Sequence, residues 1–269
     1  MRVEEFRTRV LSWYAENRRS FPWRETRDPW AILVSELMLQ QTQTHRVLPK
    51  YEAFMAAFPG PEALDAAPLA ELLRLWSGLG YNRRALALKK AAGEILGRHG
   101  GRIPDDEASL LALPGVGIYT ARALLAFAFD RPVVLIETNV RTVFIHEFFP
   151  SRESVHDREI EPLVAAALDR ADPRNWYYAL MDYGVMIKAG NPNPGRRSSH
   201  HARQTPFADS HRRVRGEILK NLGGEKAGLS ADALAARLPF ARERVEKALG
   251  ELIAEGFVAE MPGGYGLAE

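Results

Sequence analysis

Two glutamates stand where their surroundings would set different protonation behaviour. Glu36 lies four residues after Ile32 and three after Leu33, so helical spacing places its carboxyl group within an apolar stripe. Burial disfavours the charged form of a carboxyl group, and we therefore expect a raised pKa here, as a general acid near neutral pH requires. The alternative is a glutamate at the helix edge that pairs with an arginine.

Glu137 follows the apolar run VVLI and precedes a segment of helical character, TNVRTVFIHEFF. The N–H groups at a helix start favour a negative charge, so we expect this carboxylate to stay ionised. With Glu36 it would supply an acid and an anion, the usual division of roles between two carboxyl groups. Glu137 could also be a plain capping residue, and Asn139 could either bind a substrate or satisfy a turn.

A glycine-rich turn lies between these glutamates, in LPGVGIYTARALLAFAF. Its Pro-Gly-x-Gly string predicts a tight hairpin in which Gly115 and Gly117 allow close backbone approach after Leu113. Unpaired N–H groups at the following helix start can bind phosphate, and such contacts position a nucleic acid without reading its sequence. Thr120 would support the first helical turn, and Arg122 would add charge. A plain connection between helices is the alternative.

Uncharged polar and aromatic side chains accompany these groups. Tyr81 in GLGYNRR and Tyr119 in GVGIYT stand beside glycines, where a ring on a loop could stack on a base or fill the core. Gln40 and Gln41 continue the helical side of Glu36 by one turn with polar groups that carry no charge.

The scaffold that must position these residues is predicted to be all-α. The first 130 residues form amphipathic patterns separated by Pro and Gly signals, with almost no strand-type alternation. Asp28 and Pro29 make a good N-cap and first residue for the helix that carries Glu36. Further helices are expected over 139–149 and from 157 to about 188.

The composition changes over residues 190–210, which contain three Pro, three Arg, two His and a single acidic residue. Beyond this basic loop, residues 211–269 predict three helices and a hairpin around Pro-Gly-Gly, which suggests a module like a winged helix. Residues 188–217 hold seven basic and two acidic side chains, so positive charge is concentrated here. A flexible, solvated linker is the alternative for the basic loop.

Composition excludes several classes of protein. The 269 residues include no cysteine, which rules out disulfides, thiolate nucleophiles and Cys-ligated zinc or iron-sulfur clusters, and fits a reducing, cytoplasmic setting. The net charge is only +2, and we find neither a signal peptide nor an apolar run that would span a membrane. His200, His201 and His211 match no compact zinc motif, so we expect no metal and no cofactor.

Four motifs occur in order: DPWAILVSELMLQQTQT, LWSGLGYNRR, LPGVGIYTARALLAFAF and ETNVRTVF. On these motifs, over about residues 5 to 188, the chain resembles the helix-hairpin-helix (HhH-GPD) DNA glycosylases and, among them, the MutY-like adenine DNA glycosylases. The resemblance implies a glycosylase domain over 1–189, made of two helical lobes with the active site between them. It also implies a monomeric base excision repair enzyme, whose partner is double-stranded DNA containing a mismatched or damaged base that is flipped out of the stack.

The resemblance also implies roles for single residues. Glu36 matches the family's acid that protonates the flipped base, and Glu137 stands at the catalytic aspartate of its D-G-N-V string, with one methylene more. Tyr119 matches an active-site aromatic where bifunctional relatives carry a lysine. Because a tyrosine cannot form an imine, the chain is expected to be monofunctional and to leave an abasic site.

On the same resemblance, Gln40 and Gln41 fill the gap left by the flipped base, and Tyr81 is the wedge beside the opposite base. Four iron-sulfur cysteines and a Nudix-like C-terminal domain, both usual in the family, are missing from this sequence. We expect the basic loop to pack without metal and to contact DNA phosphates through Arg196 and Arg197. The expected substrate is adenine opposite 8-oxoguanine or guanine. The alternatives are a uracil or thymine mismatch glycosylase and a non-catalytic protein that binds damaged DNA.

Overall fold

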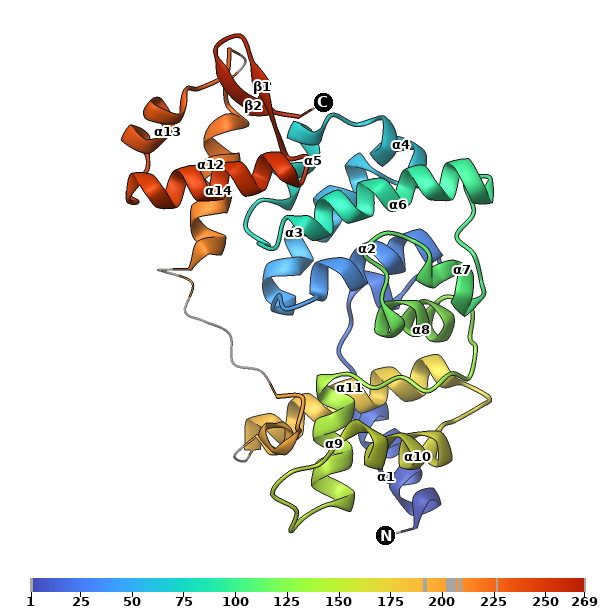
Figure 1. Ribbon diagram of the computed structural model, residues 1–269. Helices are drawn as coiled ribbons and strands as arrows, with labels where there is room; N and C mark the ends of the chain where they lie inside the picture. The colour runs from blue at the N-terminus through green and yellow to red at the C-terminus, as the bar shows by residue number, and fades with distance from the viewer. Residues whose placement is uncertain (1, 191–192, 202–206, 208–209, 226, 269) are drawn as a thin grey trace. The chain divides into compact units, whose positions relative to one another are not determined.

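The computed structural model describes residues 2–190, 193–201, 207, 210–225 and 227–268, and helices dominate them (Figure 1). The expected all-α class with one small hairpin is confirmed. By contacts the chain divides into two compact units, Met1–Leu33 with Ile103–Arg203 and Val34–Arg102 with Gln204–Glu269. The domain boundaries expected at 189 and 210 stay a prediction, because each unit joins stretches that are distant in sequence.

The first unit packs its helices around an aromatic core. Helix α9 contacts α10, α11 and the short helix η2, and α1 packs on α10 and α11. The ring of Phe6 meets those of Phe144, Phe148 and Trp176 edge to face, with centroids 5.2–5.8 Å apart. The elements are α1 (Val3–Asn17), η1 (Pro22–Arg24), α7 (Glu107–Leu111), α8 (Ile118–Phe127), α9 (Thr138–Phe148), α10 (Asp157–Ala167), α11 (Pro173–Gly190) and η2 (Pro194–Arg197).

Helix α2 (Pro29–Leu39) carries Glu36 and belongs in part to each unit. Its start follows the expected cap, because the side chain of Asp28 accepts a hydrogen bond from the backbone N–H of Trp30 at 3.0 Å. Every residue from Trp30 to Met38 is buried, so α2 is covered on all sides rather than along one stripe.

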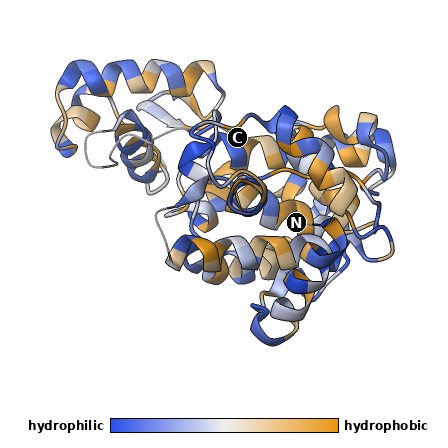
Figure 2. Ribbon diagram, turned by 90° about the horizontal axis from the view of Figure 1, so that it is seen from below, coloured by the Kyte–Doolittle hydropathy of each residue, from blue (hydrophilic) through white to orange (hydrophobic). Residues whose placement is uncertain are grey.

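The second unit contains a group of helices between α2 and residue 102. Helix α4 packs on α6, and α3 and α6 both pack on α5, with the ring of Phe54 against those of Phe58 and Trp76. Figure 2, coloured by hydropathy, shows hydrophilic and hydrophobic residues along the same helices of the chain. The elements are α3 (Thr44–Ala57), α4 (Pro61–Ala66), α5 (Leu69–Trp76) and α6 (Arg83–His99).

The C-terminal part of this unit has the predicted three helices and hairpin. Helix α14 (Arg242–Ala254) packs on α12 (His211–Leu222) and α13 (Ala231–Arg237). Strands β1 (Val258–Met261) and β2 (Gly264–Leu267) pair in antiparallel fashion, and Met261 opposite Gly264 closes the turn. Over the part of the chain that the structure describes, no helix is both long and apolar enough to cross a membrane.

Candidate active site

Glu137 caps helix α9, as the sequence predicted. Its carboxylate accepts hydrogen bonds from the backbone N–H groups of Asn139 at 2.7 Å and Val140 at 2.9 Å. The side-chain amide of Asn139 donates a third bond, at 3.1 Å, to the other carboxylate oxygen. The apolar run before Glu137 and the helix start after it therefore fix the carboxyl group in one position.

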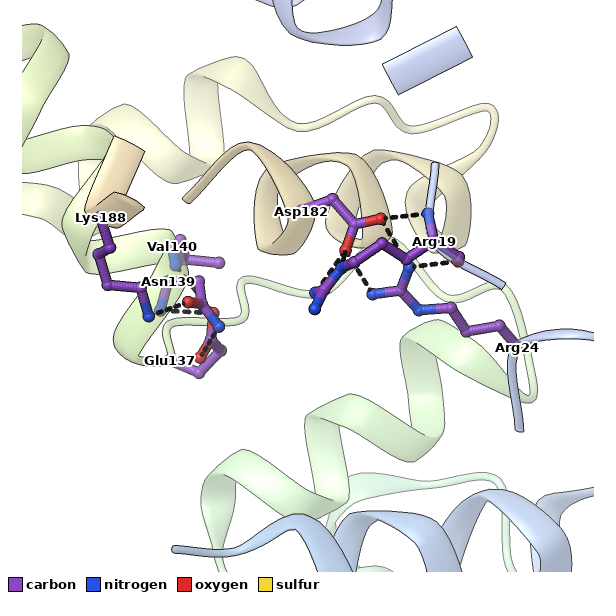
Figure 3. A network of polar contacts seen from close by, with 7 residues as sticks. All are labelled: Arg19, Arg24, Glu137, Asn139, Val140, Asp182 and Lys188. Atoms are coloured by element: carbon purple, nitrogen blue, oxygen red, sulfur yellow. Dashed lines mark hydrogen bonds and ion pairs between the residues drawn. The ribbon is translucent and has the colours of Figure 1, made fainter. Parts of the chain in front are cut away.

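Lys188 completes this group, and sequence reasoning missed it. Its ammonium, near the end of α11, donates to the side-chain oxygen of Asn139, and its charge acts on Glu137 (Figure 3). The sequence shows Lys188 only as one of several basic residues before the loop, and its distance of 51 positions from Glu137 gives no local signal. Carboxylate, amide and ammonium thus form one chain of polar contacts.

Burial governs the protonation of both charged members. Burial raises the pKa of the Glu137 carboxyl group, against the opposing effects of the two backbone hydrogen bonds and of Lys188. Burial likewise lowers the pKa of Lys188, while Glu137 acts in the opposite direction. The predicted helix-start hydrogen bonds are present, but burial acts against them and raises the pKa. The ionised state of Glu137 stays a prediction.

Helix α11 holds the start of α9 in place through close packing. A methyl group on Gly184 would come within 2.8 Å of the Cβ of Asn139 and 2.7 Å of its carbonyl oxygen, so only glycine fits. Two residues earlier, the buried Asp182 accepts hydrogen bonds from the guanidinium groups of Arg19 and Arg24 at 2.8–2.9 Å (Figure 3). Burial alone would raise the pKa of Asp182, but these arginines lower it. Asp182 thereby ties the N-terminal segment to α11.

Glu36 is buried, as its position in an apolar helix predicted. Its residue surface is 6 % exposed, and the neighbouring Ser35 is 1 % exposed. Glu36 belongs to the second unit, together with Gln40, Gln41 and Tyr81, whereas Glu137 and Asn139 belong to the first.

The glycine-rich hairpin forms between α7 and α8. Leu113 is buried and anchors the turn in the core, Gly115 adopts the left-handed φ of 79°, and Gly117 precedes α8. In the first turn of α8, Thr120 is buried and Tyr119 is half-buried. The predicted hairpin and helix start are confirmed as local structure, and phosphate binding there stays a prediction.

Arg122 was expected to add charge near this hairpin. Its guanidinium donates to the carboxylate of Glu107 at 2.7 Å and to the carbonyl of Val134 at 3.2 Å. Its charge is therefore paired within the first unit.

Gln41 and Tyr81 occupy strained turns in the second unit. Their backbones have left-handed φ angles of 55° and 49°, which side chains other than glycine rarely adopt. Gln40, at the end of α2, is half-buried and Gln41 is exposed. Arg212, from the start of α12, lies over the Tyr81 ring at 4.7 Å from its centroid and donates to its hydroxyl group.

The described residues 193–201 of the basic loop pack against α9. Residues 193–201 lie within the described part, and the strand-like pairing of Val155 with Ser198 and a side-chain cap from Asn193 hold η2 there. Arg197 donates to the carbonyl oxygens of Phe149 at 2.6 Å and Arg152 at 2.8 Å, close to the end of α9, so its guanidinium is already bound by the protein's own backbone.

Arg196 is exposed and stays a predicted DNA contact. Much of the basic loop between 202 and 209, including Arg203, lies outside the described residues. Among the residues that the structure describes, no group of three or more His, Asp or Glu side chains could hold a metal ion.

The profile of the HhH-GPD superfamily base excision DNA repair proteins matches residues 34–211, well over half of the chain. This chain belongs to that superfamily. The membership in the HhH-GPD superfamily that the four sequence motifs predicted is thus confirmed.

Among curated relatives, the adenine DNA glycosylase of Mycolicibacterium smegmatis is 34% identical over 95% of this HhH-GPD protein and 93% of the relative. The thymine/uracil-DNA glycosylase of Methanothermobacter thermautotrophicus is 30% identical over 68% of this chain and 85% of its own. Among solved structures, a thermostable thymine-DNA glycosylase has a TM-score of 0.66 at 29% identity, and covers 71% of this chain and 90% of its own. A trapped endonuclease III–DNA intermediate, at 19% identity and a TM-score of 0.60 over 78% of this chain and 92% of its own, shares the fold.

Proposed function

We propose that this HhH-GPD protein is a monofunctional DNA glycosylase that removes adenine from a mismatch with 8-oxoguanine or guanine. The observation that carries the proposal is the carboxylate of Glu137, fixed at the start of α9 by two backbone N–H groups and by Asn139. The names of the 34% identical relatives that span nearly the whole chain support adenine as the base.

Hydrolysis of an N-glycosidic bond leaves positive charge on the sugar as the base departs. A fixed carboxylate stabilises that charge or orients the attacking water, as electrostatic preorganisation requires. Glu137 takes this role, Asn139 keeps its carboxylate oriented, and Lys188 limits the rise of its pKa.

Glu36 supplies the proton that the leaving base needs. Its carboxyl group lies buried in α2, where water does not compete for the proton. The bond from sugar to base breaks with both electrons going to the base. The base takes the proton of Glu36, and water adds to the sugar while its released proton passes to the carboxylate of Glu137. The products are free adenine and an abasic site, and proton exchange with solvent restores both glutamates.

Tyr119 accounts for the absence of a strand-cleavage step. A phenol cannot form the imine that a lysine would form with the opened sugar, so the reaction ends at the abasic site. The hairpin before α8, the exposed Gln41 and the exposed Arg196 are the proposed contacts to the DNA backbone and to the gap left by the base.

A panel of labelled duplexes tests the proposal. Each duplex contains adenine, thymine or uracil opposite guanine, or adenine opposite 8-oxoguanine or thymine, and is treated with alkali after incubation. We expect alkali-dependent breaks at adenine opposite 8-oxoguanine or guanine, no breaks without alkali, and no borohydride-trapped complex. Breaks at thymine or uracil alone would assign the protein to the other mismatch class, and no breaks in any duplex would contradict the proposal.

A variant of the acid tests the assignment of Glu36. Glu36→Gln keeps the shape and removes the proton, so single-turnover excision should fall roughly a hundredfold or more, the usual contribution of a general acid. An unchanged rate with an unchanged pH profile would remove Glu36 from the mechanism.

A further inference from the structure

Two turns of the second unit, which carry Gln41 and Tyr81, converge on one guanidinium group. Arg84, in the first turn of α6, donates through Nη1 to the carbonyl oxygens of Leu37 at 2.7 Å and Met38 at 3.0 Å, and also to that of Gln40. These carbonyls lie at the end of α2, which leads directly into the turn at Gln41.

The same guanidinium also holds the second turn. Nη2 of Arg84 donates to the carbonyl of Gly80 at 2.9 Å and, more weakly, to that of Leu79 at 3.4 Å. Nε faces the carbonyl of Tyr81 at 3.4 Å. The hydroxyl group of Thr42 accepts from Nη2 at 3.1 Å and donates to Leu79 at 3.2 Å, which adds a second link between the turns.

Arg84 is held by neutral oxygen atoms. Burial lowers its pKa to about 10, with only Tyr81 acting in the opposite direction, and no carboxylate appears among its hydrogen-bond acceptors in the described residues. At neutral pH the group stays charged, because a pKa near 10 lies well above 7. Its planar fork matches six carbonyls spread over two turns, which a lysine could not do.

The backbone at both turns requires such support. Gln41 and Tyr81 each adopt a left-handed φ without being glycine, and conformations of this kind persist only where surrounding contacts impose them. Gln41 follows directly on an acceptor of Arg84, and Tyr81 is itself one, so a single side chain stabilises both strained positions.

We infer that Arg84 is a positioning residue that locks the turns at Gln41 and Tyr81 into one rigid unit, so that both side chains enter the DNA duplex together. The inference rests on the proposed function, since it concerns how the base is extruded rather than how its bond is broken. Base extrusion costs unstacking energy, and side chains that fill the vacated space and hold the neighbouring base would offset that cost.

Lys89 provides a matched control on the same helix. Its ammonium also binds backbone carbonyls, those of Leu64 at 3.1 Å and Ala67 at 2.7 Å, but these lie at α4 and not at either turn. Lys89→Met and Arg84→Met each remove one charged group that binds carbonyls. When each variant is assayed the same number of degrees below its own melting temperature, an effect on positioning is separated from a loss of stability.

The first test follows base unstacking by the fluorescence of 2-aminopurine placed at the target position. Arg84→Met should slow the rise in fluorescence on mixing with DNA by roughly a hundredfold, as expected for misplaced groups, while Lys89→Met keeps the wild-type rate. Hydrogen exchange of the free protein should become faster in both turns in Arg84→Met and only near residues 64–67 in Lys89→Met. Exchange that rises in one turn only, or unstacking that slows equally in both variants, would overturn the inference.

The second test asks whether Gln41 and Tyr81 act as a unit. In the wild-type background, the double variant Gln41→Ala/Tyr81→Ala should slow unstacking by less than the product of the two single fold-changes. Each single substitution already disables the shared unit. In the Arg84→Met background the two effects should multiply. Multiplicative effects in both backgrounds would contradict coupling through Arg84.

These readouts separate the two proposals. If unstacking depends on Arg84 but no duplex loses its base, the proposed glycosylase activity is wrong and the positioning role stands. If bases are excised and unstacking is indifferent to Arg84, the reverse holds.

Discussion

The start of α9 and the end of α2 each bind a charged side chain, and the two charges have opposite signs. At α9, the carboxylate of Glu137 accepts hydrogen bonds from free N–H groups, and at α2 the guanidinium of Arg84 donates to free carbonyl groups. Each charge complements the helix dipole at its end. Burial disfavours the charged form in both cases, since it raises the pKa of Glu137 and lowers that of Arg84.

The two regions differ in what stands opposite the charge. Glu137 has the charge of Lys188 close to it, whereas Arg84 has neutral oxygen atoms. A carboxyl group with a raised pKa can change its protonation over an accessible pH range, but an arginine with a pKa of about 10 stays charged at neutral pH. The first arrangement suits chemistry, and the second suits the holding of a backbone shape.

Removing the charge of Glu137 should have the largest effect. Glu137→Gln keeps the hydrogen-bonding oxygen of the cap but cannot stabilise a cationic sugar, so single-turnover excision should fall by about a hundredfold to a thousandfold. Glu137→Asp keeps the charge, with a shorter reach, and should lose less. Excision by Glu137→Gln at the wild-type rate would show that Glu137 is only a cap.

The same variant should gain stability as it loses activity. Because the folded-state pKa of Glu137 is raised above the ordinary 4.5, folding favours the neutral carboxyl group over the ionised one. The neutral group therefore adds to the free energy of unfolding at low pH, and this contribution is lost as pH rises through the folded pKa. Glu137→Gln should therefore melt above the wild type at neutral pH, by roughly 2–4 °C for each kcal/mol recovered. Below pH 4.5 the variant and the wild type should melt at the same temperature. A variant that melts lower at neutral pH would contradict the sign.

Crowding the start of α9 should displace the carboxylate without changing its charge. Gly184→Ala would place a methyl group 2.7 Å from the carbonyl oxygen of Asn139, which forces backbone to move. We expect excision to fall roughly a hundredfold and stability to fall by about 1–3 kcal/mol. Gly250→Ala, within α14, is the matched control, since no atom lies within 4 Å of the new methyl group and the helix should gain stability. Equal behaviour of the two variants would disprove the close packing.

These regions also show what the sequence could and could not predict. The cap at Glu137, the start of α2 at Asp28 and the C-terminal hairpin were predictable, because each depends on residues a few positions apart. The link from Arg84 to α2 spans 44 to 47 positions, and that from Lys188 to Asn139 spans 49. No local pattern marks such contacts.

The pairing of Arg122 and the burial of Glu137 could not be predicted from the sequence. Arg122 was expected to add charge at the hairpin, and the structure pairs that charge with Glu107, fifteen positions earlier. The sequence near the helix start indicated the hydrogen bonds that lower the pKa of Glu137, but not the burial that raises it, because that burial depends on tertiary packing.

Removing the counter-charge would make the Glu137 site resemble the Arg84 site. Lys188→Met deletes the ammonium that lowers the pKa of Glu137, so that pKa should rise further. Excision requires the ionised form of Glu137, so the acid limb of the plot of excision rate against pH should move to higher pH. Where the limb lies above neutral pH, the rate at pH 7 should fall roughly tenfold for every further pH unit that the limb moves. Recovery of the rate at higher pH distinguishes this effect from damage to Asn139. A lower rate at every pH, with an unmoved acid limb, would contradict it.

The smallest effects concern the neighbours Arg196 and Arg197, one of which resembles Arg84. Arg197 donates to carbonyls near the end of α9, so Arg197→Ala should lower the melting temperature and leave the salt dependence of DNA binding unchanged. Arg196 is exposed, and Arg196→Ala should leave stability intact and weaken binding to all duplexes alike. If Arg196 contacts one phosphate, the slope of log K against log salt should flatten by about 0.9. An unchanged slope in Arg196→Ala, or a flattened one in Arg197→Ala, would contradict this division, which rests on the fact that the guanidinium of Arg197 is already bound to backbone carbonyls within the protein.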